Sequence, residues 1–136
     1  MQRHIAQSKH NHEFLCCIKD KFPDKFYDWK ITSTFYIAIH YVRALSKKRG
    51  ITIGNSHESL KNAIDPKPPM PPILVLSPEC LSAYKTLYRY CRTARYDGFL
   101  NEENFNRICK INYENYCAPA LEVVKTYIET QSIVLS

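Results

Sequence analysis

Glycine is scarce in this sequence, with only three among 136 residues. Stretches in which apolar and polar residues strictly alternate are also few. Because half-buried strands show that alternation and many tight turns need glycine, the two shortages together favour helices. Neither a glycine-rich phosphate loop nor a GxSxG elbow occurs, so the motifs give no support to phosphate-loop or serine-hydrolase chemistry.

Long apolar runs are lacking as well. A helix needs about 20 mostly apolar residues to span a bilayer, and no segment of this sequence reaches that length without interruption. The N-terminal stretch MQRHIAQSKHNHEF has no apolar centre of the kind found in signal peptides. We therefore expect a cytoplasmic protein without membrane association.

The six cysteines include no CxxC pair, the spacing typical of zinc sites and redox-active disulfides. Most of them fall in helical patterns, where small buried thiols are common. His12 and Cys16 are one helical turn apart, but His10 lies roughly 200° around the helix from His12, so three ligands would not converge. We expect free thiols, no metal and no cofactor, and we expect the lone His4 to lie at the surface.

Length and charge set the remaining limits. A chain of 136 residues is long enough for one hydrophobic core and too short for two, so we expect a single domain over residues 1–136. The net charge of +6 suits an acidic partner, nucleic acid first, and is equally typical of a solvated basic surface.

Hydrophobic periodicity predicts an all-α fold with four long helical segments. We expect a first helix over 2–19, broken at Pro23, and a second over 28–49 with Asp28 as its N-cap. Ser56 is the expected cap of a short helix over 57–64, and Ser77-Pro78-Glu79 marks a further helix start. The proline-rich stretch between them should be extended, with its ILVL tail packed on the bundle. One or two C-terminal helices, kinked or divided at Pro119, should follow.

The second helix carries apolar residues on two sides. One stripe contains Ile31, Phe35, Ile39 and Val42, and the other contains Trp29, Ser33, Tyr36, His40 and Arg43. A helix buried on two sides lies in the middle of a bundle, and unpaired buried polar groups are costly. The second stripe therefore predicts a polar groove or a polar seam. We favour the groove, because Asp28 is the one acid obviously available to pair with that stripe.

Two later helices add expected faces. On the helix that starts at Pro78, a basic face beside the packed face holds Lys85, Arg89, Arg92 and Tyr96, while the packed face holds Leu81, Tyr84, Tyr88, Cys91 and Arg95. The C-terminal pattern predicts the following inward residues: Phe105, Ile108, Ile111, Tyr116, Leu121, Val124, Tyr127 and Ile128. Arginines interleaved with tyrosines suit phosphate contact and base stacking.

Four landmarks follow one another along nearly the whole chain: Asp28-Trp29; Phe35-Tyr36 with His40; Ser56-His57; and a tyrosine-rich helix ending Ala94-Arg95-Tyr96. This ordered set resembles the small stand-alone prokaryotic HEPN (higher eukaryotes and prokaryotes nucleotide-binding) domain proteins. The resemblance implies an up-and-down bundle of four or five helices that commonly forms a homodimer. It also implies RNA or nucleotide binding, RNA cleavage, or a toxin–antitoxin or defence setting.

The chain departs from the motif of many HEPN ribonucleases, an arginine followed four to six residues later by a histidine. No histidine follows Arg92 or Arg95 at that spacing. Metal-free RNA cleavage needs a proton acceptor, a proton donor and a cation, so a catalytic pair would have to be assembled from different helices.

Three functional hypotheses follow. The first is a binding module for RNA, a nucleotide or a partner protein, with a groove lined by Tyr36, His40, Arg43, His57, Arg92, Arg95 and Tyr96. The second is a metal-independent ribonuclease in which His57 and Arg92 are catalytic. The third, implied by the resemblance, is a subunit that acts through a nucleotidyltransferase-type partner protein.

Overall fold

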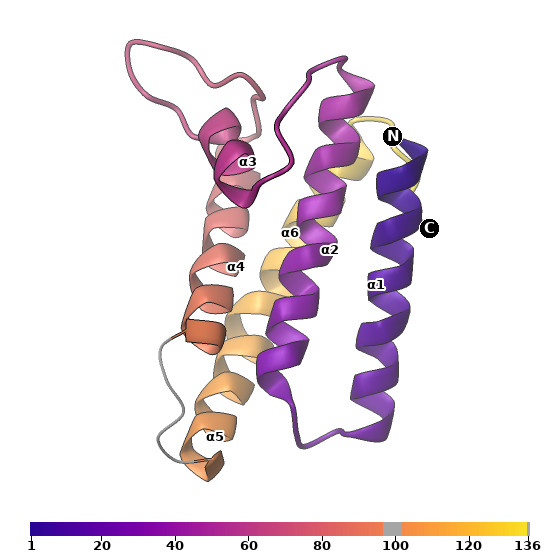
Figure 1. Ribbon diagram of the computed structural model, residues 1–136, viewed down its shortest axis with the longest axis vertical. Helices are drawn as coiled ribbons and strands as arrows, with labels where there is room; N and C mark the ends of the chain where they lie inside the picture. The colour runs from indigo at the N-terminus through magenta and orange to yellow at the C-terminus, as the bar shows by residue number, and fades with distance from the viewer. Residues whose placement is uncertain (97–101, 136) are drawn as a thin grey trace.

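The chain folds into an all-α bundle in the computed structural model, which describes residues 1–96 and 102–135 except for the side chains of Tyr96 and Glu102. Its elements are α1 (Gln2–Lys21), α2 (Tyr27–Lys48), α3 (His57–Ile64), α4 (Pro78–Tyr96), α5 (Glu102–Asn112), a π-helical segment η1 (Tyr113–Cys117) and α6 (Ala118–Thr130). Helices α1, α2, α4 and the α5–α6 rod alternate in direction along the bundle (Figure 1). The predicted all-α bundle is confirmed.

Helix α2 lies in the middle of the bundle and contacts α1, α4 and α6. The predicted apolar stripe of Ile31, Phe35, Ile39 and Val42 is fully or nearly fully buried. A further side, which includes Ile37 and Leu45, is buried as well. The second predicted stripe is covered less fully: Arg43 is buried, Ser33, Tyr36 and His40 are partly buried, and Trp29 is 51% exposed.

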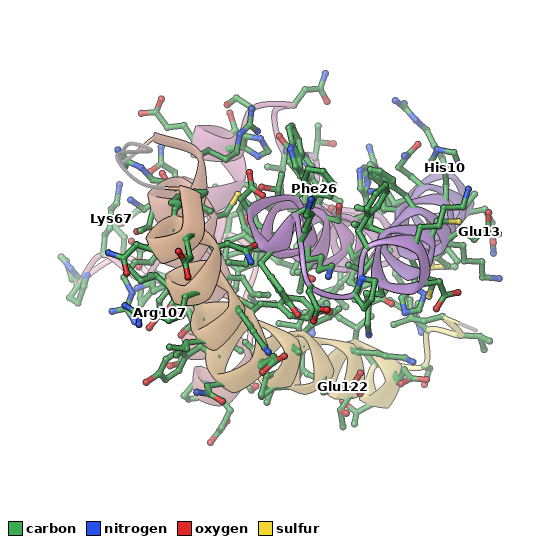
Figure 2. All side chains as sticks on the ribbon, turned by 90° about the horizontal axis from the view of Figure 1, so that it is seen from below. His10, Glu13, Phe26, Lys67, Arg107 and Glu122 are labelled. Atoms are coloured by element: carbon green, nitrogen blue, oxygen red, sulfur yellow. The ribbon has the colours of Figure 1, made fainter. Side chains whose placement is uncertain are left out.

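The start of α2 differs from the prediction. Its N-cap is Phe26, in a left-handed conformation with φ 59°, and no side chain caps the helix. Asp28 lies inside the first turn, where its carboxylate still favours the helix dipole, so the predicted Asp28 cap is wrong. The connection is held instead by Lys30, whose Nζ donates to the Phe22 carbonyl at 2.7 Å, and by the Tyr27 hydroxyl, which donates to the Pro23 carbonyl at 2.7 Å. Figure 2 shows Phe26 at this end of the bundle.

Both predicted serine caps are confirmed. Ser56 Oγ accepts from the Ser59 amide at 3.0 Å at the start of α3, and Ser77 Oγ accepts from the Cys80 amide at 3.1 Å at the start of α4. In the ILVL segment, Leu74 and Leu76 are buried, while the alternate residues Ile73 and Val75 are exposed. This segment thus packs on the bundle through one side only.

The C-terminal rod shows a second correction. The predicted inward positions of Leu121, Val124 and Ile128 are confirmed, but Ile108, Ile111 and Tyr116 are each 47% exposed. The residues buried in place of these three are Cys109, Tyr113 and Cys117. The four-residue spacing from Cys109 to Leu121 needs more residues per turn than a regular α-helix provides. The π-helical turn at Tyr113–Cys117, with Pro119 directly after it in α6, supplies that wider turn.

The six cysteines are free, with Cys16 and Cys17 exposed and the other four buried. Burial raises the pKa of the Cys80 and Cys117 thiols to about 12, so both stay protonated and unreactive at neutral pH. Within 1–96 and 102–135 no cluster of three His, Cys, Asp or Glu could hold a metal ion. In the same ranges no helix is both long and apolar enough to cross a membrane.

Candidate functional site

Two adjoining cavities open along α2, and together we call them the groove. The first, the α3 cavity, lies where α2, α3 and α4 meet and has a volume of about 290 Å³; it is lined by Phe35, Tyr36, His57, Tyr88, Cys91, Arg92 and Arg95. The second, the α1 cavity, has a volume of about 380 Å³ and is lined by Gln7, Asn11, Phe14, Trp29, Thr32, Ser33, Tyr36, His40 and Arg95. Tyr36 and Arg95 line both. Among the described residues no carboxylate lines either cavity.

Phe35 forms the floor of the α3 cavity. Its ring is 3% exposed, and the centroids of four other rings lie within 6.1 Å of it: Tyr84 at 5.5 Å, Tyr88 at 5.7 Å, His57 at 6.0 Å and Tyr36 at 6.1 Å. Such spacings are typical of favourable aromatic contacts. The aromatic walls of the cavity are thus positioned by one buried ring from the centre of α2.

Cations gather on the α3 and α4 side of this cavity. Arg92 Cζ lies 5.9 Å from the Tyr88 ring centroid, and Lys61 Nζ lies 5.3 Å from the same centroid. Together with Arg95, they place positive charge beside partly buried aromatic rings, and no carboxylate is among the described lining residues. A group that carries both a negative charge and a flat ring would complement this wall.

His57 is the first residue of α3, directly after the Ser56 cap. Its Nε2 lies 3.3 Å from the Tyr36 hydroxyl. Burial lowers the pKa of His57 below its ordinary value, and the charges of Arg43 and Arg95 lower it further. The imidazole is therefore neutral at pH 7 and able to accept a proton or a hydrogen bond.

Arg43 lies beneath the groove and anchors the loop before α3. It is 8% exposed, and its Nη1 donates to the Gly54 carbonyl at 3.0 Å while Nη2 donates to the Ser56 carbonyl at 3.1 Å. The partners of the buried guanidinium are therefore main-chain carbonyls and not an acid such as Asp28. The loop also approaches α3 closely, because a Cβ added at Gly54 would come within 2.7 Å of Ser59 Oγ.

His40 lines the α1 cavity and contacts His4 of α1. Their Nδ1 atoms are 3.0 Å apart, and the two rings are stacked with centroids 5.2 Å apart. His4 is therefore only partly exposed, because its ring packs against that of His40. Burial, the charge of His40 and the charge of Arg43 lower the pKa of His4 to about 4, and burial followed by Arg43 lowers that of His40. One nitrogen must donate while the other accepts, so the pair cannot hold its geometry when both rings are protonated.

This pair predicts a pH dependence of stability. The pKa of His4 is about 4 in the folded chain, against an ordinary 6.5, so the unfolded chain binds more protons between these values. The free energy of unfolding should then fall as the pH drops from 7 to 4, by about 1 to 2 kcal/mol from His4 after allowing for solvent screening. In the His4→Gln variant this contribution is absent, so its free energy of unfolding should decrease less than that of the parent protein. Urea unfolding at pH 7.0, 5.5 and 4.5 measures the difference.

The matched control is His10→Gln. His10 is on the same helix, and Figure 2 shows it pointing away from α2 together with Glu13. This variant should keep the full decline of the parent protein. Equal pH profiles for His4→Gln and the parent would contradict the assignment of the effect to the His4–His40 pair.

The structure brings together four of the predicted site residues in the α3 cavity, namely Tyr36, His57, Arg92 and Arg95. His40 lies in the adjoining α1 cavity. Arg43, which was predicted to line the groove, lines neither cavity and holds the loop before α3. The Tyr96 side chain lies outside the described part of the chain. Sequence reasoning missed the contribution of α1, whose Gln7, Asn11 and Phe14 recur at helical spacing and line the α1 cavity.

Comparisons with known proteins add no relative. No family model, no curated protein and no solved structure matches this chain. Functional inference therefore depends on the chemistry of the groove.

Proposed function

We propose that this chain is a HEPN-like binding module whose groove holds a ribonucleotide, either free or as part of an RNA chain. The observation that carries the proposal is the α3 cavity, which combines Arg92 and Arg95 with the rings of Tyr36 and Tyr88 and has no carboxylate among its described lining residues. Arginine donates paired hydrogen bonds to phosphate oxygens. Aromatic side chains stack on bases of any sequence.

The family resemblance also supports the proposal. Four of its landmark residues are far apart in the sequence, yet Trp29, Tyr36, His57 and Arg95 all line the same groove. Residues that bind one ligand together have to share a surface in this way. On this proposal the setting is a prokaryotic toxin–antitoxin or defence system in the cytoplasm, with a homodimer as the assembly.

Arg92→Ala tests the phosphate contact. The substitution should weaken the binding of a 5′-phosphorylated ribonucleotide or short RNA about 10- to 100-fold, because a charge-assisted hydrogen bond contributes about 1.5 to 3 kcal/mol. It should also reduce the salt dependence of RNA binding. Calorimetric titration with AMP and with a short RNA in EDTA, at two salt concentrations, measures both effects.

Arg89→Ala is the matched control, since Arg89 is an exposed arginine one turn earlier on α4 that lines a different cavity. It should leave affinity nearly unchanged. If both variants lost the same affinity, the effect would come from the overall charge of the protein, and the assignment of the phosphate contact to Arg92 would be wrong. Absence of binding to either ligand at low salt would overturn the proposal and favour a partner protein, for instance a nucleotidyltransferase.

A metal-independent ribonuclease is the second candidate. The observation in its favour is that His57, with its lowered pKa, lines the same cavity as Arg92. A neutral imidazole can take the proton of a 2′-hydroxyl, and a guanidinium can stabilise the charge that develops on phosphorus. Cleavage of labelled RNA in EDTA that His57→Ala/Arg92→Ala abolishes would establish this activity. Binding without cleavage would leave the binding module alone.

A further inference from the structure

The α1 cavity presents exposed aromatic rings that the α3 cavity does not use. Trp29, the single tryptophan of the sequence, is 51% exposed, and Phe14 across from it on α1 is 47% exposed. Around them the lining includes the polar, uncharged side chains of Gln7, Asn11 and Ser33. Large exposed aromatic rings beside hydrogen-bonding amides are typical of surfaces on which a base stacks and its edges are contacted.

The two cavities are continuous but distinct. Both are lined by Tyr36 and Arg95. Trp29 and Tyr36 are seven residues apart on α2, so they lie on the same side of the helix and are separated by two turns, roughly 10 Å along its axis. Each cavity, at about 290 and 380 Å³, has the size of a small pocket for one ligand group.

The charges of the two cavities differ. Apart from the shared Arg95, no lysine or arginine among the described residues lines the α1 cavity, and the lowered pKa of His40 leaves that side chain neutral at pH 7. The α3 cavity adds Arg92 and His57. An aromatic pocket with a single cation favours a base over a second phosphate, and that cation, Arg95, is shared with the α3 cavity.

We propose that the groove holds a single strand of RNA across at least two nucleotides, with one base against Trp29 in the α1 cavity and its neighbour against Tyr36 and Tyr88 in the α3 cavity. The proposal rests on the proposed function and names its ligand as an RNA chain in place of a free nucleotide. Arg95 serves both nucleotides, because a guanidinium has five N–H donors and can reach a phosphate while keeping a contact within the protein. The amides of Gln7 and Asn11 are available to base edges and to the 2′-hydroxyl.

The test compares ligands that differ by one nucleotide. Calorimetric titration with AMP and with 5′-phosphorylated ApA in EDTA should give about tenfold or tighter binding for the dinucleotide, as expected for one further stacked base. Trp29→Ala should bring the affinity for the dinucleotide down to about that for AMP, and Trp29→Phe should restore part of the gain. Trp29 fluorescence of the parent protein should respond to the dinucleotide far more than to AMP.

Phe22→Ala is the matched control, because Phe22 is a comparably exposed ring, at 44%, that lines neither cavity; it should keep the full gain. If AMP binds and the dinucleotide binds no tighter, the two-nucleotide assignment is overturned while the proposed function stands. A dinucleotide gain that survives Trp29→Ala also overturns it, since the second base then lies elsewhere. If neither ligand binds the parent protein, the proposed function itself fails. A dinucleotide of deoxyadenosine that binds as tightly as ApA would overturn the assignment to RNA.

Discussion

Replacing Phe35 with alanine should lower the free energy of unfolding by about 3 to 5 kcal/mol, the range for removing a buried phenylalanine from a core. Phe35 is 3% exposed and contacts the rings of Tyr36, His57, Tyr84 and Tyr88. The loss should reach the groove as well, because three of those four rings line the α3 cavity. We expect affinity for a ribonucleotide to fall at least tenfold at a temperature where the variant is still folded.

Urea unfolding followed by circular dichroism measures the stability, and calorimetric titration with AMP measures the affinity. Phe35→Leu should lose less stability, since leucine fills more of the space. The exposed ring of Phe22 provides the control, and Phe22→Ala should cost less than about 1 kcal/mol. If Phe35→Ala kept the parent's affinity while folded, the floor would have no part in shaping the site.

Replacing Arg43 with methionine should have the second largest effect. It removes the donors that hold the carbonyls of Gly54 and Ser56. Each hydrogen bond from a charged group contributes about 1.5 to 3 kcal/mol, and part of this loss is offset because the variant no longer has to bury a cation. We expect a net loss of about 2 to 4 kcal/mol. Ligand affinity should fall too, because the loop that Arg43 anchors places His57 at the cavity wall.

The conservative and distant variants separate these causes. Arg43→Lys keeps the charge but replaces the planar fork by one ammonium group, so it should recover only part of the stability and affinity. Lys47→Met removes an exposed cation one turn later on α2 and should change stability by about 0.5 kcal/mol or less. An Arg43→Met protein that is as stable as the parent would show that the loop needs no anchor.

Much of the fold could be predicted because its signals are local. Ser56 and Ser77 each stand directly before a run of helical periodicity, and both are the caps that the structure contains. Asp28 carried the same kind of signal and misled, because the chain reaches α2 through a left-handed residue held by Lys30 and Tyr27. Those two contacts join residues to main-chain carbonyls, which have no signature in a sequence.

The site was predicted as far as side chains repeat along single helices. Tyr36 and His40 follow the period of α2, and Arg92 and Arg95 share one end of α4, so a groove beside these helices was expected. His57 joins these residues only because Arg43 holds the loop before α3 in place. The His4–His40 contact depends on how α1 packs on α2. Tertiary packing of this kind has no fixed spacing along the chain, so the sequence alone did not reveal it.

The π-helical turn at Tyr113–Cys117 has a consequence for how this protein tolerates evolutionary change. A π-helical turn holds one residue more than an α-helical turn, so deleting one residue within it would restore regular winding and leave α5 and α6 nearly in their present orientation. Deleting one residue from the regular turns of α6 would instead rotate the part of the rod before it by about 100°. Ile108 would then take the place of Cys109, and Asn112 would replace Tyr113 in the core. The loss of one residue should therefore be tolerated better in the π-helical segment than in the regular helix that follows it.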